Sequence, residues 1–201
     1  MDVTTRRAVL AGGGLAGAAL VAGGTVAAAA WLRKPAPQIF TPVADPEVTL
    51  QDMSSLKPTQ PPAPLPALRF ADAAGAGHTL AEFAGKGVVL NLWATWCVPC
   101  VAELPSLVAL AGKLAAAGIV VLPLSDDRGG APVVQRFYQT HSIAGLGVWL
   151  DPKGMAAEAL GARGLPTTII IDRQGRERAR LEGGADWASA EAVAAVIRLA
   201  G

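Results

Sequence analysis

Apolar residues follow two different spacings along residues 68–201, and the pattern predicts alternating strands and helices. Val88–Trp93 and Ile119–Leu124 are apolar runs of strand length, typical of strands buried on both faces of a sheet. Cys97–Ala117 has the pattern of a helix, and Gly118 supplies the glycine expected at its end. The shorter predicted strands are 68–71, 79–80, 148–150, 167–171 and 176–182. The shorter predicted helices are 132–140 and 155–160, and a final helix begins at a cap, Asp186 or Ser189, and runs to Leu199. This order predicts an α/β fold with a central mixed sheet flanked by helices on both faces and an N-terminal hairpin.

The first 34 residues differ from the rest because they carry one long uncharged stretch. No charged residue occurs at 8–31, between the basic pairs Arg6-Arg7 and Arg33-Lys34. About 20 such residues suffice to cross a bilayer, so residues 1–34 are predicted to be a membrane anchor or a long signal peptide. The first basic pair also resembles a twin-arginine export motif, and a simple basic flank is the alternative. Each interpretation sends the remaining chain out of the cytoplasm.

Residues 35–66 are predicted to be a linker. They hold nine of the fifteen prolines and show no hydrophobic period, and proline-rich chains form semi-rigid spacers. A spacer between an apolar segment and a folded domain at 67–201 favours retention at the membrane. We therefore expect the domain at the periplasmic face of the bacterial inner membrane, with cleavage and a soluble periplasmic form as the alternative.

Length and net charge limit the classes of function that the chain can have. A chain of 201 residues is long enough for one domain with its own core beside these extra segments. Its net charge of +1 gives no basic surface for nucleic acid. We expect a monomer without a nucleic-acid partner.

The only two cysteines stand together in Trp96-Cys97-Val98-Pro99-Cys100. Such a pair can close into a disulfide and open again, which carries two electrons. The thiolate is the reactive species, and at the start of a helix free N–H groups and the helix dipole favour it. Cys97 is therefore the expected nucleophile and Cys100 the resolving thiol, with Pro99 fixing the turn between them. The alternatives are a static disulfide, which would contribute little in so short a loop, and a metal site.

The segment Asn91–Cys100 resembles the active-site segment of the thioredoxin superfamily, and more narrowly that of the TlpA/ResA-like membrane-anchored thiol–disulfide oxidoreductases. Three further features match that group: Glu103 with Pro105 after the cysteines, a strand and short helix at 148–160, and the cis-proline segment Gly164–Thr168. The resemblance covers about residues 68–201. It implies a thioredoxin-like fold with a central strand–helix insertion.

The resemblance also implies roles for residues around the cysteines. Trp96 should lie against the pair and shield it from water. A cis bond before Pro166 should turn the backbone of Leu165 toward Cys97, where an extended peptide can add like a strand, with Thr167 beside it. Selectivity should then lie in the surface near Leu165 and Val98.

A buried aspartate moves the proton of the resolving cysteine in thioredoxins, but Asn91 stands at its place here and cannot ionise. Glu103 lies one helical turn after Cys100 on about the same face. A carboxylate partly buried there would have a raised pKa and could exchange protons with Cys100. The alternative is a solvated helix glutamate.

These features together predict an extracytoplasmic reductase of protein disulfides. The resemblance implies targets in cytochrome maturation, either apocytochrome c or copper-site assembly proteins of cytochrome oxidase, and a membrane thiol electron donor. No cofactor besides the Cys97–Cys100 disulfide and no metal is expected. The alternatives are a disulfide-forming oxidase, which the absence of a histidine between the cysteines disfavours, and a copper-binding assembly factor, since thiolates suit Cu(I).

Overall fold

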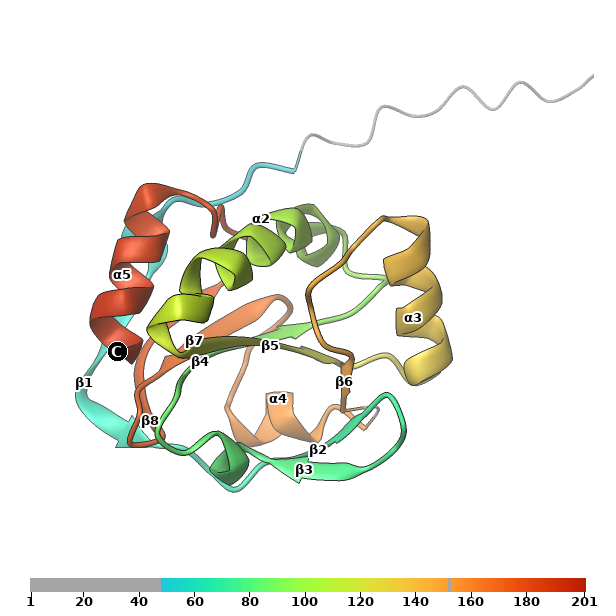
Figure 1. Cartoon of the computed structure of the whole chain (residues 1–201), viewed down its shortest axis with the longest axis horizontal. Helices are drawn as coiled ribbons and strands as arrows, with labels where there is room; N and C mark the ends of the chain where they lie inside the picture. The colour runs from blue at the N-terminus through green and yellow to red at the C-terminus, as the bar shows by residue number, and fades with distance from the viewer. Residues whose placement is uncertain (1–47, 152) are drawn as a thin grey trace, which may run out of the picture. The chain divides into compact units, whose positions relative to one another are not determined.

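A computed structural model gives the structure of the chain and describes residues 48–151 and 153–201 (Figure 1). The predicted anchor at 1–34 and the linker up to residue 47 lie outside the described residues. In the described part, helices lie on both sides of one mixed sheet, which confirms the predicted α/β, thioredoxin-like fold.

Eight strands form the sheet in the order β1-β8-β7-β4-β5-β6-β2-β3. Their bounds are Lys57–Pro64 (β1), Arg69–Asp72 (β2), Gly77–Thr79 (β3), Gly87–Trp93 (β4), Ile119–Ser125 (β5), Trp149–Leu150 (β6), Thr167–Ile171 (β7) and Arg176–Glu182 (β8). The central strand β4 pairs in parallel with β5 and antiparallel with β7. Every residue of β4 and β7 is buried, as expected for apolar runs covered on both faces.

The helices divide between the two faces of the sheet. Their bounds are Met53–Ser55 (η1), Leu80–Phe83 (η2), Val98–Leu114 (α2), Ala115–Ala117 (η3), Ala131–Thr140 (α3), Met155–Ala159 (α4) and Ala190–Ala200 (α5). Residues of α2, α3 and α5 join one hydrophobic cluster, and residues of α4 and η2 join the other. In Figure 1, α2 and α5 accordingly lie above β4 and β5, and α4 lies below them.

Strand β4 alternates between the two clusters with the period of two that a strand requires. Val89 and Trp93 belong to the α2 side, whereas Val88, Leu90 and Leu92 belong to the α4 side. The same period places Asn91 on the α2 side. This polar residue in an otherwise apolar strand therefore faces the helix that carries the cysteines.

The predicted boundary between linker and domain at residue 66 is wrong. Lys57–Pro64 forms β1, which pairs antiparallel with β8, and Gln51 bridges Ala185 before it. Because β1 is rich in proline, its sequence does not have the pattern of a strand. An edge strand, however, needs hydrogen bonds on one side only and therefore tolerates proline. Its register shifts between Pro58 and Ala63, which accommodates the residues without a backbone N–H.

The predicted hairpin and the predicted strand–helix segment are both present in the described chain. The hairpin is β2 with β3, although β1 precedes it and it lies at the opposite edge of the sheet. In the second segment, β6 pairs with β5 and β2, and α4 follows it. Asp151 between them is buried and accepts the backbone N–H of Ala156 at 2.6 Å, which fixes the start of α4.

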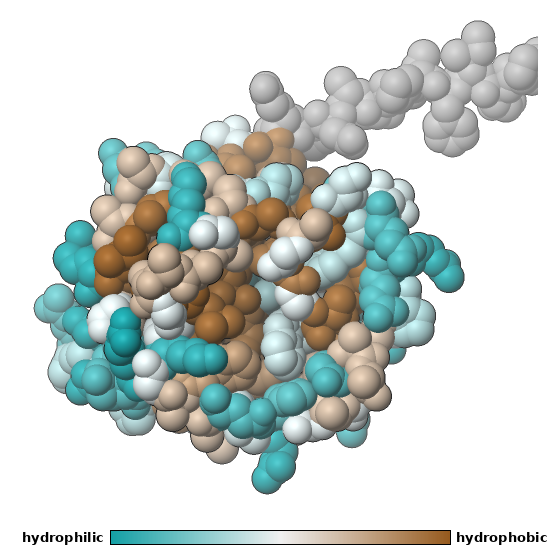
Figure 2. Space-filling view, in the orientation of Figure 1, coloured by the Kyte–Doolittle hydropathy of each residue, from teal (hydrophilic) through white to brown (hydrophobic). Residues whose placement is uncertain are grey.

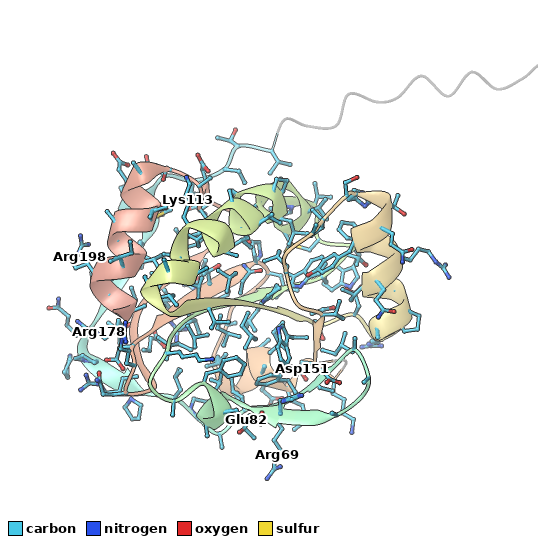
Figure 3. The ribbon with its side chains drawn as sticks, in the orientation of Figure 1. Arg69, Glu82, Lys113, Asp151, Arg178 and Arg198 are labelled. Atoms are coloured by element: carbon cyan, nitrogen blue, oxygen red, sulfur yellow. A yellow bond between two sulfur atoms is a disulfide. The ribbon has the colours of Figure 1, made fainter. Side chains whose placement is uncertain are left out.

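The helix α2 with its extension η3 is long and apolar enough to cross a membrane by composition, at Val98–Ala117. It is the central helix of the domain, however, because its leucines at 104, 107, 110 and 114 are fully buried against the sheet and α5. Figure 2 shows the face over α2, where apolar residues reach the surface at the middle and hydrophilic residues gather around the edge. In Figure 3, Arg69, Arg178 and Arg198 point away from this core, each from a different element.

Candidate active site

The helix α2 begins immediately after Cys97, which is its N-cap residue, and Pro99 occupies the first turn. Cys97 and Cys100 form a disulfide. Cys97 retains 6 % exposure while Cys100 is fully buried. The structure thus places one sulfur at the helix start, within reach of solvent, and the other one turn deeper.

A cavity of about 500 Å³ opens beside Cys97. Its lining comes from the active-site turn, the end of β5 and the segment before β7, and includes Trp96, Cys97, Pro99, Asp126, Arg163 and Leu165. Trp96 lines this cavity beside Cys97 and is 66 % exposed, and its shielding of the pair from water stays a prediction. Val98 is also 58 % exposed, so two large apolar side chains flank the cysteine at the surface.

The cis-proline segment lies against the same cavity. The peptide bond between Leu165 and Pro166 is cis, and Leu165 lines the cavity with Cys97. The Thr167 side chain is fully buried and donates its hydroxyl to the carbonyl of Gly164 at 2.7 Å. Thr167 therefore fixes the turn that presents Leu165 and does not itself line the surface.

The Glu103 side chain is fully buried and accepts three hydrogen bonds. Its Oε1 accepts from Nδ2 of Asn91 at 2.8 Å. Its Oε2 accepts from the backbone N–H of Ala185 at 2.9 Å and from the indole Nε1 of Trp187 at 3.0 Å. The structure therefore contradicts a solvated helix glutamate and places this carboxyl in the core, one turn after Cys100.

Burial raises the pKa of Glu103 to about 7, while the hydrogen bonds from Ala185, Asn91 and Trp187 lower it in part. Desolvation penalises the charged form of a carboxyl, and donors to the carboxylate favour it. The result is a group that is half protonated near neutral pH.

Asn91 completes this cluster from the strand side. It lies opposite Thr168 in the pairing of β4 with β7, and its Nδ2 also donates to the Thr168 hydroxyl at 2.9 Å. Its Oδ1 is buried without a hydrogen-bond partner among the described residues. The amide can therefore donate a hydrogen bond to the carboxylate in its present orientation or, when rotated, accept a hydrogen bond from a protonated Glu103.

Two acidic residues follow β5 and lie near the active site, and one of them fixes the turn before the cysteines. Asp127 is buried and accepts the backbone N–H of Thr95 at 2.9 Å and its hydroxyl at 2.6 Å. Asp126 lies in the cavity wall, where burial and the neighbouring Asp151 raise its pKa and Arg128 lowers it.

Neither histidine is placed beside the disulfide, although His141 lines a second cavity together with Trp96 and Val98. His78 contacts the carboxylates of Glu82 and Asp72, and His141 stacks on Phe137 at 3.9 Å between ring centroids. Neither lines the cavity beside Cys97. Over residues 48–151 and 153–201, no group of three or more His, Cys, Asp or Glu side chains is placed to hold a metal ion.

The sequence pattern assigns no role in the site to Trp187, Ala185 or Thr168. The register of β7 against β4 brings Thr168 to Asn91, and the turn after β8 brings Trp187 to Glu103. The unusual asparagine within an apolar strand was the one available signal, since a buried amide requires partners.

Fold and site define a thioredoxin-like protein that carries a Cys-x-x-Cys disulfide at the start of its central helix. The chain belongs to the AhpC/TSA family, whose sequence model matches residues 61–179.

Curated relatives include the thiol-disulfide oxidoreductase ResA of Bacillus thuringiensis subsp. konkukian, 32 % identical over 112 residues, which are 56 % of this chain. The match spans 64 % of the length of that relative. Among solved structures, a DsbF homologue from Corynebacterium diphtheriae has a TM-score of 0.59 and 26 % identity, over 72 % of this chain and 92 % of that one. A secreted thiol-disulfide isomerase from Corynebacterium glutamicum has a TM-score of 0.55 and 26 % identity, over 67 % and 85 % of the two chains.

Proposed function

We propose that the protein is an extracytoplasmic thiol–disulfide oxidoreductase that reduces protein disulfides. The observation that carries the proposal is the disulfide at the start of α2, with Cys97 at the wall of a cavity and Cys100 buried behind it. A disulfide built for stability alone closes a long loop, whereas this one joins cysteines that are only three positions apart.

The reaction begins with the reduced pair. The Cys97 thiolate attacks one sulfur of a target disulfide, the target S–S bond breaks, and a mixed disulfide forms while the second target sulfur leaves as a thiolate. Cys100 then loses its proton and attacks the Cys97 sulfur, which releases the target as a dithiol and leaves the Cys97–Cys100 disulfide. Two electrons have passed to the target, and a thiol donor must return them before the next cycle.

Glu103 is the proposed proton acceptor for Cys100. Both residues are fully buried on α2, three positions apart, so water cannot readily serve in this role. A group with a pKa of about 7 accepts and returns a proton with comparable ease at neutral pH.

Trp96, Val98 and Leu165 provide the proposed docking surface for the target. The first two are exposed apolar side chains next to Cys97 in the chain, and Leu165 lines the same cavity as Trp96 and Cys97. An extended target segment would pair with the backbone beside Leu165 as an added strand.

The reducing direction and the targets are parts of the same proposal. Val98 and Pro99 separate the cysteines, and no histidine stabilises the reduced thiolate there. By resemblance, the targets are apocytochrome c or copper-site assembly proteins, and the electron donor is a membrane thiol protein. A periplasmic location at the inner membrane is supported by the uncharged stretch at 8–31 and by the relative described as secreted.

Trapping tests this function most directly. In the full chain with Cys100→Ser, the mixed disulfide on Cys97 cannot be resolved, so targets should accumulate as conjugates that a thiol reagent releases. Cys97→Ser is the matched control and should trap nothing. If the two variants trapped the same amount of conjugate, the proposed roles of Cys97 and Cys100 would be contradicted.

The reduction potential tests the direction. A value near that of thioredoxin, about −270 mV, supports a reductase, whereas a value near about −120 mV would support the oxidase alternative.

A further inference from the structure

Residues 183–187, which connect β8 to α5, lie behind the active site and contact two of its parts. The backbone N–H of Gly183 donates to the carbonyl of Pro166 at 2.8 Å, next to the cis peptide bond. Gly184 packs so closely on the active-site turn that an added Cβ would lie 2.9 Å from the carbonyl oxygen of Pro99. This connection therefore holds the cis-proline segment and the cysteine turn to one piece of backbone.

The same connection reaches the buried carboxyl through Ala185 and Trp187. Both donate an N–H to the single oxygen Oε2 of Glu103, at 2.9 and 3.0 Å. Trp187 is itself fixed: its ring is fully buried, and its backbone N–H donates to the hydroxyl of Ser106 at 3.1 Å, one turn further along α2. The indole is thus held over Glu103 by independent contacts.

We propose that Trp187 is a positioning residue that orients the Glu103 carboxyl and stabilises its ionised form, so that the proton exchanged with the dithiol resides on Oε1. The inference rests on the proposed function in one respect only, namely that Cys100 is the group with which Glu103 exchanges this proton. The orientation of the carboxyl does not depend on that function.

The chemistry of the hydrogen-bond donors around Glu103 favours Oε1 over Oε2 as the site of the proton. An indole N–H and a backbone N–H can only donate, so Oε2 with both of them is a poor site for a proton. Oε1 faces Asn91 alone, and the amide of Asn91 has a buried Oδ1 without a partner among the described residues. When the amide rotates, Oδ1 can accept a hydrogen bond from a proton on Oε1.

Among the described residues, no charged side chain contributes to the pKa of Glu103. Strand β4 contributes Asn91, β7 contributes Thr168, the connection contributes Ala185 and Trp187, and α2 itself contributes Cys100. The pKa of Glu103 is raised by burial and lowered by its three donors. Removing one donor should therefore change the titration of Glu103 directly.

The first test uses the oxidised full chain without substitution. The indole N–H resonance of Trp187 should shift with pH through the same midpoint as the Glu103 carboxyl carbon, both followed by NMR. Trp93 is an internal control, because it is equally buried and its indole nitrogen has no partner among the described residues. Its resonance should not follow Glu103. A Trp187 resonance that is insensitive to pH would overturn the proposal, and this measurement needs no variant to fold.

The second test compares Trp187→Phe with the matched variant Trp93→Phe. Loss of one hydrogen bond to a charged group should raise the Glu103 midpoint by about one pH unit in Trp187→Phe. Trp93→Phe removes a similar volume of core but no donor, so its midpoint should stay at the wild-type value. Equal midpoints in the two variants would overturn the proposal.

A kinetic test links the positioning to the reaction. In reduced Trp187→Phe, the pH dependence of target release by Cys100 should move upward by the same amount as the NMR midpoint. If the NMR shifts appear but the wild-type protein reduces no disulfide, the proposed function fails and the orientation of Glu103 by Trp187 stands. If disulfides are reduced but the Glu103 midpoint is unchanged in Trp187→Phe, the positioning role fails and the function stands.

Discussion

The buried Glu103 should make the stability of the oxidised protein fall as pH rises from about 4.5 to about 7, and Glu103→Gln should remove this dependence. The carboxyl has an ordinary pKa of 4.5, and burial raises it to about 7 in the fold. At about 1.36 kcal/mol per pH unit, this difference corresponds to about 3 kcal/mol.

The sign follows from the two pKa values. Below about pH 4.5 the carboxyl is protonated in both states, so the folded state gains the full stabilisation. Between about pH 4.5 and about pH 7 the unfolded chain ionises first, and unfolding becomes progressively easier. Above about pH 7 both states are ionised and the loss is complete.

Glu103→Gln is a suitable comparison because it keeps the size and shape of the side chain without a titratable proton. Its amide oxygen can accept the two N–H groups of Ala185 and Trp187, and its NH₂ can donate to Asn91 once that amide rotates. All other titrating groups, His78 among them, remain in both proteins and cancel in the difference.

Urea unfolding of the oxidised full chain, followed by tryptophan fluorescence from about pH 4 to about pH 8, measures the effect. We expect the free energy of unfolding of Glu103→Gln minus that of the wild type to rise by about 3 kcal/mol over this range. Two curves that run parallel within about 0.5 kcal/mol would refute the reasoning, because Glu103 would then titrate alike in both states.

Further predictions concern packing and docking. Trp96→Ala, at an exposed site, should change the free energy of unfolding by no more than about 0.5 kcal/mol yet slow exchange with protein disulfides more than with a small disulfide, measured by stopped-flow fluorescence. Trp93→Ala, at a fully buried site, should cost about 3–5 kcal/mol in urea unfolding, and equal stability losses for the two tryptophans would contradict the assigned burial. Gly87→Ala should destabilise the fold by about 1–3 kcal/mol, because the new methyl would lie 2.5 Å from the carbonyl oxygen of Ala200. Gly112→Ala, on the exposed side of α2 with no atom within 4 Å, should instead stabilise it by about 1 kcal/mol, and a loss at this control site would show that the assigned space is absent.

The regular elements were predictable because their cause is local. The apolar runs of β4 and β5 and the glycine at the end of η3 are recognisable from the sequence, and the structure confirms these elements. Strand β1 was not predictable, because its prolines lower β-propensity and only pairing with β8 makes it a strand.

The active site was predictable in part. The position of Cys97 at the start of a helix follows from local pattern, and the burial of Glu103 from its spacing to Cys100. The partners of Glu103 were not accessible, because Trp187 is 84 residues away in sequence and no local pattern marks it. The exposure of Trp96 also depends on which tertiary neighbours cover it, which composition does not specify.

The pairing of Asn91 with Glu103 gives the buried cluster a single group that binds a proton. Nδ2 of Asn91 lies 2.8 Å from Oε1 of Glu103. An aspartate at position 91 would place a second carboxyl at this distance, and two carboxyls so close cannot both ionise. The asparagine avoids this repulsion and still serves both states of its neighbour, as a donor to the carboxylate and, when rotated, as an acceptor for the acid. In the proposed function, this carboxyl, with a pKa of about 7, takes one proton when Cys100 attacks and returns it when the pair is reduced again. An amide at position 91 therefore leaves Glu103 as the carboxyl of this cluster, and in our proposal it is the group that exchanges protons at neutral pH.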